Sequence, residues 1–111
     1  MPDLDQMRKG TTPLAILKLL ADHDAPLHGY QIIRLLEQRG RGQFQFNEGL
    51  IYPRLHQMEE DGLLHSTWIG EVGGRRRKVY ELTDMGRAKL ESELREWLAF
   101  SRGMHALLDG S

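Results

Sequence analysis

Four hydrogen-bonding side chains lie close together in the middle of the chain, and a run of basic side chains follows them. The first group is Asn47, Glu48, Tyr52 and Arg54, and the basic run occupies residues 75–78. Amide, carboxylate and guanidinium groups form paired hydrogen bonds with flat polar partners, and adjacent arginines bind anionic oxygens. These residue types predict binding to a polar, anionic partner.

The residues that catalysis commonly requires are missing from the sequence. There is no cysteine to act as a nucleophile and no Gly-x-Ser-x-Gly turn. The glycines of residues 70–74 lack the following helix that a phosphate-binding loop needs. We therefore expect neither an enzyme nor a bound cofactor.

The histidines do not form a metal-binding pattern. None of the five has an i, i+4 partner or a well-placed carboxylate of the kind found in paired sites, so no metal is expected. They are His23, His28, His56, His65 and His105. His28 is better placed to open a helix.

The length and composition are those of one soluble globular domain. The chain has 111 residues, 40% hydrophobic and 28% charged, with a formal net charge of −1. That charge argues mildly against a nucleic-acid partner, because many such proteins are strongly basic. Residues 70–80, however, hold four basic residues against Glu71 alone, a local excess of three. No apolar run approaches the roughly 20 residues of a membrane span, and no signal-peptide core is present, so a cytoplasmic protein without a membrane partner is expected.

Three helices are expected in the first half of the chain. Thr12 followed by Pro13 predicts an N-cap and first turn, with a helix from about 13 to 22, preceded by a basic arm. A second helix is expected from His28 to about residue 38. Asn47 is a good N-cap for the third, and Gly62 is placed to close it in a left-handed conformation.

The third helix has one narrow apolar stripe, formed by Ile51, Leu55 and Met58. Its other side carries small, aromatic and hydrogen-bonding residues, which suits insertion into a DNA major groove. Those residues are Asn47, Gly49, Tyr52, Arg54 and Gln57. Pro53 predicts a kink, or the start of the regular part. Taken alone, this stretch is equally typical of an amphipathic surface helix.

Alternating residues after Gly62 predict a β-hairpin over residues 64–69 and 78–82, with a glycine-rich, arginine-tipped loop. Thr83 is then the expected N-cap of a long helix reaching about residue 108. The apolar residues of this helix recur at nearly heptad spacing. They are Leu90, Leu94, Trp97, Leu98, Met104 and Leu108.

Three helices followed by a hairpin are the element order of a winged helix-turn-helix, a mostly α fold in which the hairpin is the wing. We expect residues 1–82 to form a DNA-binding unit and residues 83–111 a dimerisation helix. The third helix would read base edges, and Arg75, Arg76 and Arg77 would contact phosphates. The last helix could also fold back on the first, and this is compatible with dimerisation on a two-fold axis.

Several motifs make the chain similar to the short-tailed branch of the PadR family of bacterial transcriptional regulators. They are Arg8-Lys9-Gly10, His28-Gly29-Tyr30-Gln31-Ile32, Gly49-Leu50-Ile51-Tyr52-Pro53, Glu59-Glu60-Asp61-Gly62-Leu63-Leu64, and Tyr80-Glu81-Leu82-Thr83-Asp84-Met85-Gly86. Trp68, Arg77 and Trp97 extend the match. Leu50 departs from it, because the family usually has threonine there.

The resemblance implies a dimeric winged-helix protein, usually a repressor, with a C-terminal dimerisation helix and often a small aromatic or drug-like effector. It also implies that Arg8, Lys9, Tyr30 and Tyr52 contact the DNA backbone. The full expected DNA-binding set is Arg8, Lys9, Tyr30, Gln31, Asn47, Glu48, Gly49, Tyr52, Arg54, Arg75, Arg76 and Arg77. Trp97 either stacks on a planar effector at the dimer interface or packs in its core.

The sequence thus predicts a homodimeric DNA-binding transcriptional regulator, a repressor released by a small hydrophobic or aromatic effector. Its partners would be a two-fold symmetric operator and a second copy of the chain. The alternative is a winged-helix module that binds another protein and no DNA, because this fold serves both uses.

Overall fold

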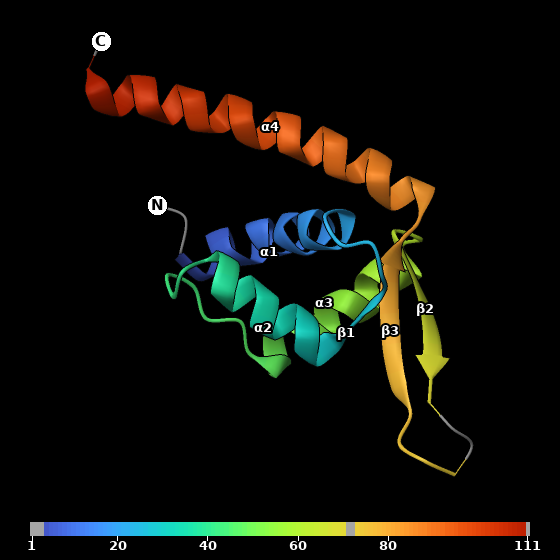
Figure 1. Cartoon of the computed structure of the whole chain (residues 1–111). Helices are drawn as coiled ribbons and strands as arrows, with labels where there is room; N and C mark the ends of the chain where they lie inside the picture. The colour runs from blue at the N-terminus through green and yellow to red at the C-terminus, as the bar shows by residue number, and fades with distance from the viewer. Residues whose placement is uncertain (1–3, 71–72, 111) are drawn as a thin grey trace.

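The protein is described here by a computed structural model, which covers the backbone of residues 4–70 and 73–110 and the side chains of residues 11–70 and 73–110. Figure 1 shows a helical body with a projecting hairpin and a long last helix. The elements are α1 (Leu4–Ala21), β1 (Leu27–His28), α2 (Gly29–Arg39), α3 (Glu48–Glu60), β2 (Leu64–Ile69), β3 (Arg77–Leu82) and α4 (Asp84–Asp109). The expected winged helix-turn-helix with a long C-terminal helix is confirmed.

The helix boundaries in the second half of the chain follow from local signals. Asn47 caps α3, since its Oδ1 accepts the Leu50 N–H at 2.9 Å. Thr83 caps α4 in the same way, and its Oγ1 accepts the Gly86 N–H at 3.0 Å. Gly62 follows α3 with a φ of +80°, a left-handed conformation that glycine adopts without strain. All three sequence predictions are confirmed.

The start of α1 differs from the prediction. The helix begins at Leu4 and runs through Pro13, so Thr12 is not an N-cap. Proline inside a helix removes one backbone hydrogen bond, but the turns on either side keep their own. Thr12 is only 2% exposed, which is the position of a packed residue within the helix. The expected basic arm is therefore part of α1.

The sheet has a third strand that was not predicted from the sequence. Strand order is β1-β3-β2, with both pairs antiparallel. β1 is only two residues long, and it pairs Leu27 with Tyr80 and His28 with Val79. The stretch between α2 and α3 contains no strand.

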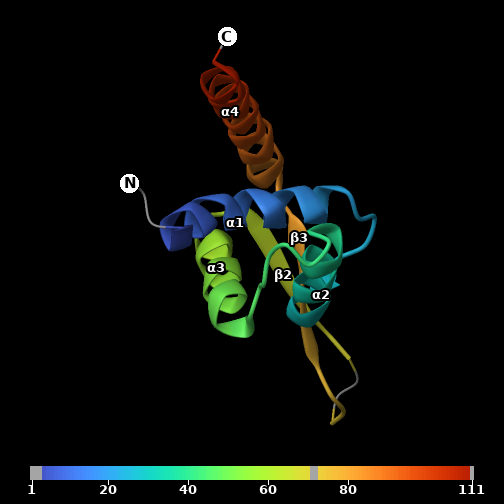
Figure 2. The same ribbon diagram turned by 90° about the vertical axis from the view of Figure 1, so that its left-hand side faces the viewer.

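The core lies where α1, α2 and α3 meet the upper half of the sheet (Figures 1 and 2). The α3 stripe of Ile51, Leu55 and Met58 is buried as expected. The remaining buried members of the core are Ile16, Leu17, Leu19, Leu20, Leu27, Ile32, Ile33, Leu36, Leu64, Tyr80 and Leu90. Because this stripe is the buried part of α3, the other side of the helix stays largely open to solvent.

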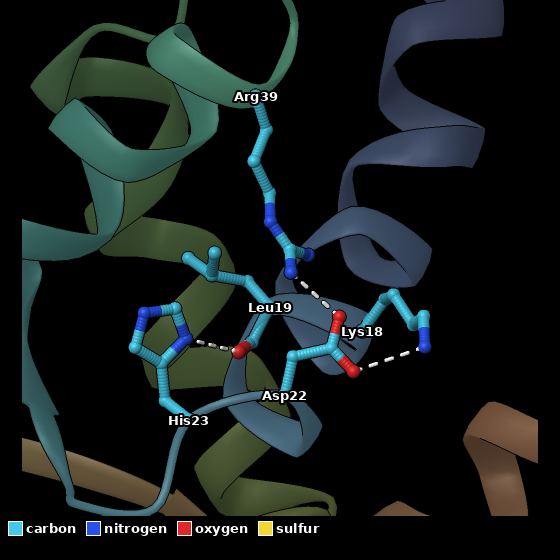
Figure 3. A network of polar contacts seen from close by, with 5 residues as sticks. All are labelled: Lys18, Leu19, Asp22, His23 and Arg39. Atoms are coloured by element: carbon cyan, nitrogen blue, oxygen red, sulfur yellow. Dashed lines mark hydrogen bonds and ion pairs between the residues drawn. The ribbon is translucent and has the colours of Figure 1, made fainter.

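One carboxylate joins the ends of the first two long helices (Figure 3). Asp22, which follows α1, accepts hydrogen bonds from Arg39 at 2.6 Å and from Lys18 at 3.0 Å. These bonds, the one from Arg39 first, lower the pKa of Asp22. Beside it His23 Nδ1 lies 2.8 Å from the Leu19 carbonyl oxygen. The network links the C-terminal end of α1 to the C-terminal end of α2.

The first turn of α4 fixes the direction of the whole helix. Thr83 Oγ1 donates to the Gly62 carbonyl at 2.6 Å, and the Thr83 N–H donates to the Leu63 carbonyl at 3.1 Å. A Cβ at Gly86 would lie 2.2 Å from that same Leu63 oxygen, so only glycine fits there. Past Leu90, α4 extends beyond the body, on the side opposite the wing (Figure 1).

Candidate nucleic-acid interface

An open groove runs between the start of α2, the start of α3 and the wing, which is the β2–β3 hairpin. Its volume is about 640 Å³. Figure 2 shows that α3 begins on the side of the molecule toward which the wing projects, away from α4. The groove is lined by His28, Gly29, Tyr30, Glu48, Tyr52, Trp68, Arg75, Arg76, Arg77, Lys78 and Tyr80. Three elements far apart in sequence thus share one face.

Two tyrosines stand at the helical side of the groove. Tyr52 packs over Gly29, where a Cβ would lie 2.4 Å from the Tyr52 ring. Tyr30 is 52% exposed, and Arg34 lies one turn later with its Nη1 at 3.4 Å from the Tyr30 hydroxyl. The same guanidinium is 5.8 Å from the Tyr30 ring centroid, within the range of a cation–π contact. Both phenol groups are therefore presented to the groove.

His28 lines the groove and is the N-cap of α2. Its Nδ1 accepts the Gln31 N–H at 3.2 Å, and the Gln31 side chain accepts the His28 N–H at 3.0 Å, a reciprocal capping box. The prediction that His28 opens the second helix is confirmed. Its Nε2 lies 2.9 Å from Arg77 Nη1 of the wing. Burial of the ring, and then the charge on Arg77, lowers the pKa of His28.

An ion pair fastens the wing to α3. Glu59 accepts hydrogen bonds from Lys78 at 3.0 Å and from the Ser66 hydroxyl. These bonds, the one from Ser66 first, lower the pKa of Glu59, and the bond to Glu59 raises the pKa of Lys78. Lys78 also lies 5.5 Å from the centroid of the Tyr80 ring. The wing therefore holds a fixed position relative to α3.

The wing loop closes through one glycine. Gly70 has a φ of +126°, and a Cβ there would lie 2.5 Å from the Arg75 carbonyl oxygen. Any larger residue would force the two sides of the loop apart. Gly70 thereby brings Arg75 back toward the groove. Glu71, the acid counted within the basic segment, lies outside the described residues.

The groove is electropositive although the chain is not. Four basic side chains line it, Arg75 to Lys78, and among its described lining residues the one carboxylate is Glu48. The net charge of −1 for the whole chain therefore does not describe the groove, where basic side chains outnumber carboxylates. A concave surface lined with one sign of charge concentrates its field and attracts the opposite charge, here an anion.

The groove gathers half of the predicted DNA-binding set: Tyr30, Glu48, Tyr52, Arg75, Arg76 and Arg77. Gln31 and Asn47 are not among the lining residues, and their side chains cap α2 and α3. Gly49 is exposed on the first turn of α3. Arg8 and Lys9 lie within α1, and their side chains fall outside the described residues.

Arg54 lies apart from the groove. It lines a second, smaller hollow of about 220 Å³ on the other flank of α3, together with Leu17 of α1 and Lys89 and Glu93 of α4. The reason is helical geometry, because Arg54 is two residues from Tyr52 and side chains two apart point in nearly opposite directions.

Five lining residues are not among those that the sequence predicts to bind DNA: His28, Gly29, Trp68, Lys78 and Tyr80. Trp68 had a usable signal, because it is a large aromatic residue on a strand that leaves the core, and it is 61% exposed. Lys78 was counted only as part of the basic run. His28 had no signal beyond its capping position, since its approach to Arg77 joins residues 49 positions apart.

A second exposed surface lies on α4. Leu90 belongs to the core and Leu94 is partly buried, but the residues that continue the same seam are open to solvent. Trp97 is 41%, Leu98 44% and Leu108 78% exposed, and Met104 is also exposed. Phe100, absent from the predicted seam, places its ring 6.1 Å from that of Trp97. We call Trp97, Leu98, Phe100, Met104 and Leu108 the α4 apolar face.

The fold and groove define a winged helix-turn-helix protein, and comparison with known proteins gives its family. A family model described as the transcriptional regulator PadR-like family matches residues 16–92. The chain is also 36% identical over 90 residues to Transcriptional regulator Rv3488 of Mycobacterium tuberculosis, a match covering 81% of this chain and 78% of the relative. The protein therefore belongs to the PadR-like family of transcriptional regulators, and as such it is not an enzyme.

Solved structures of the same family share the whole architecture. A PadR-like transcriptional regulator from Bacillus cereus superposes with a TM-score of 0.80 at 31% identity, covering 96% of this chain and 99% of the other. A PadR family transcriptional regulator from Eggerthella lenta gives a TM-score of 0.81 at 27% identity, covering 97% of this chain and 90% of the other.

Within the described residues, no helix combines the length and apolar character needed to cross a bilayer.

Proposed function

We propose that this chain acts as a homodimer that binds operator DNA through the groove between α2, α3 and the wing. The observation that carries the proposal is the convergence of three tyrosines and four basic side chains on one face. Phosphate oxygens on either side of a DNA groove would meet the basic wing, while the start of α3 enters the major groove. Residues 1–82 are the DNA-binding unit in this account.

The roles within the interface follow from position and chemistry. Arg75, Arg76 and Arg77 hold phosphates, which sets affinity and register without selecting sequence. Sequence is read by Glu48 and by the amide of Asn47, whose Oδ1 is engaged by its own helix cap while its NH₂ group remains a donor. Gly49 lets the α3 backbone approach closely. Arg54, on the other flank, contributes to selectivity only if it reaches a neighbouring phosphate or base edge.

The α4 apolar face supports dimerisation through residues 83–111. A row of large apolar side chains along one helix is rarely left in water, because burial of such surface is worth about 25 cal/mol per Å². Packing two such faces across a two-fold axis would bury them and place two copies of α3 on successive turns of DNA.

We assign regulation by the same reasoning to α4, the proposed dimerisation helix. Repression released by a small aromatic ligand is the behaviour that the family resemblance implies, and the cytoplasm is the compartment where it would operate. Trp97 beside Phe100 offers flat, exposed rings on which a planar ligand could stack. Such a ligand would act by altering the angle between the two α4 helices.

Selection of binding sites from a random DNA pool tests the proposal. A dimer predicts an enriched sequence with two-fold symmetry, whose half-sites are one or more helical turns apart. An enriched but asymmetric short site would contradict the dimer alone. A pool with no enriched sequence would contradict DNA binding and favour a winged helix that binds another protein.

A further inference from the structure

Two contacts of His28 are incompatible with each other. Nδ1 accepts the Gln31 N–H at 3.2 Å, which requires a lone pair on Nδ1. A neutral imidazole then carries its proton on Nε2. The 2.9 Å neighbour of Nε2 is Arg77 Nη1, and a guanidinium has donors but no acceptor. Two donors therefore face each other.

The capping bond decides which contact is retained. The Gln31 N–H is fixed in the first turn of α2, where no backbone carbonyl is available to it. The reciprocal bond from the His28 N–H to the Gln31 side chain, at 3.0 Å, holds the same geometry. Arg77 is exposed at the start of β3 and can adjust. The proton consequently lies on Nε2, and both His28 and Arg77 line the groove.

Two converging donors with no acceptor between them define a site for an anionic oxygen. We infer that His28 Nε2–H and Arg77 together bind one phosphate oxygen of the DNA backbone, an inference that rests on the proposed function. The oxygen would lie beside the pair, within hydrogen-bond distance of both nitrogens, and would accept a hydrogen bond from each, so that the two donors no longer face each other. His28 thus becomes a DNA-contacting residue that bridges α2 and the wing.

The surroundings of the pair favour an anion. Arg76 and Lys78 add positive charge beside it, and the hydroxyl-bearing rings of Tyr52 and Tyr80 are further lining groups. Glu48 is the carboxylate that opposes this charge among the described lining residues. Since burial and Arg77 lower the pKa of His28, the ring is neutral at neutral pH and acts as a hydrogen-bond donor without a charge of its own.

The phosphate clamp formed by His28 and Arg77 is tested with His28→Asn, a substitution that separates the two roles of the histidine. Asparagine is an effective N-cap, as Asn47 shows in α3, but its short side chain cannot reach Arg77. We expect His28→Asn to keep the thermal stability within a few degrees and to weaken binding of selected operator DNA by about tenfold, the effect of one hydrogen bond to a charged group. The matched control is His65→Asn, an exposed strand residue outside the groove, which should leave binding unchanged.

The salt dependence separates the two members of the pair. Removing neutral His28 should lower affinity at every salt concentration and leave the slope of log K against log salt unchanged. Arg77→Gln should reduce that slope by about 0.9 for each phosphate that is no longer neutralised. In the double variant the decrease in affinity should be smaller than the product of the two single decreases, because one oxygen is shared. Equal affinity of His28→Asn and wild type, with wild type binding DNA, would overturn the clamp and leave the proposed function standing.

Nitrogen NMR of the free protein tests the tautomer without any variant. A proton on Nε2 of His28, with unprotonated Nδ1, supports the clamp, and a proton on Nδ1 overturns it. Titration with inorganic phosphate at constant ionic strength, followed by DNA, distinguishes the source of the anion. A His28 shift with DNA at micromolar concentration assigns the site to the DNA backbone. A shift with inorganic phosphate alone, absent with DNA, would overturn that assignment, and failure of wild type to bind any DNA would overturn both the clamp and the proposed function.

Discussion

The ring of Tyr52 occupies the place where a side chain on Gly29 would be. A Cβ at Gly29 would lie 2.4 Å from Cε1 and 2.9 Å from Cζ of that ring. Glycine at the first residue of α2 thus sets where a tyrosine of α3 stands, although the two are 23 positions apart. The packing of α2 against α3 at the groove therefore depends on the absence of a side chain at residue 29.

Gly29→Ala is expected to displace Tyr52 and weaken DNA binding. The ring is 41% exposed and can swing outward, so the free energy of unfolding should change by less than about 1 kcal/mol. Affinity for operator DNA should fall by about three- to tenfold, the effect of removing about one hydrogen bond. Thermal unfolding and fluorescence anisotropy measure the two effects. Tyr52→Phe is the control for the hydroxyl, and an unaltered affinity for Gly29→Ala would show that the position of the ring is immaterial.

The ion pair between Glu59 and Lys78 predicts a pH-dependent stability. The pKa of Glu59 is lowered from 4.5, so its contribution is present above that pH and is lost as the pH falls below it. The pKa of Lys78 is raised from 10.5, so its contribution is present below that pH and is lost above it. Glu59→Gln should therefore lower the free energy of unfolding by about 1 kcal/mol at pH 7 and by less at pH 3 to 4.

Thermal or urea unfolding at the two pH values measures this difference. Glu60→Gln is the matched control, because Glu60 is the next residue and its partner His56 is well exposed, as Glu60 is. The Glu60→Gln substitution should leave the free energy of unfolding at pH 7 almost unchanged. Equal costs for the two substitutions would mean that the wing is not held by Glu59.

The wing arginines are expected to act on all DNA sequences alike. Arg75→Ala combined with Arg76→Ala should weaken operator and random DNA by similar factors and reduce the salt slope by about 1.8 per protomer. The control is Arg41→Ala with Arg87→Ala, two exposed arginines that do not line the groove and remove the same formal charge. If the wing variant binds operator as tightly as wild type at physiological salt, the wing does not contact phosphate.

A charge on the α4 apolar face is expected to break the dimer. Leu98→Glu would place a carboxylate in the seam, where burial of an unpaired charge is strongly unfavourable. Sedimentation analysis should then find a monomer, and operator affinity should fall by more than tenfold because each half-site is bound separately. Ala99→Glu, on the opposite side of the same helix, is the control. A wild-type monomer at micromolar concentration would refute the role given to α4.

Short-range signals explain which parts of the fold could be predicted. Asn47, Gly62 and Thr83 act on groups within four residues, so their positions in the sequence are sufficient. The strand at Leu27 and His28 could not be predicted, because two residues carry no periodicity and their conformation depends on pairing with β3. The start of α1 differs from the prediction because Thr12 and Pro13 are typical of a helix start, whereas packing keeps them inside a longer helix.

The same limit applies to the interface. The arginine run and Tyr52 were found from residue type, since both are conspicuous in the sequence. His28 was not found, because its role depends on Arg77, 49 positions later, and on the tautomer that Gln31 imposes. Arg54 was grouped with Tyr52 by proximity in sequence, whereas the helix turns it to the other flank. The chemistry of single residues can be inferred from a sequence. Which of these residues lie close together is known only once the fold is known.

The central claim is that the groove binds the DNA backbone, and a salt series tests it most directly. Fluorescence anisotropy would follow wild-type protein on a labelled selected operator and on random DNA from low to physiological salt. The account predicts tighter binding to the operator and a slope of log K against log salt near about −5, from three wing arginines in each of two protomers at about 0.9 each. Weak binding to both DNAs with a nearly flat slope would contradict it.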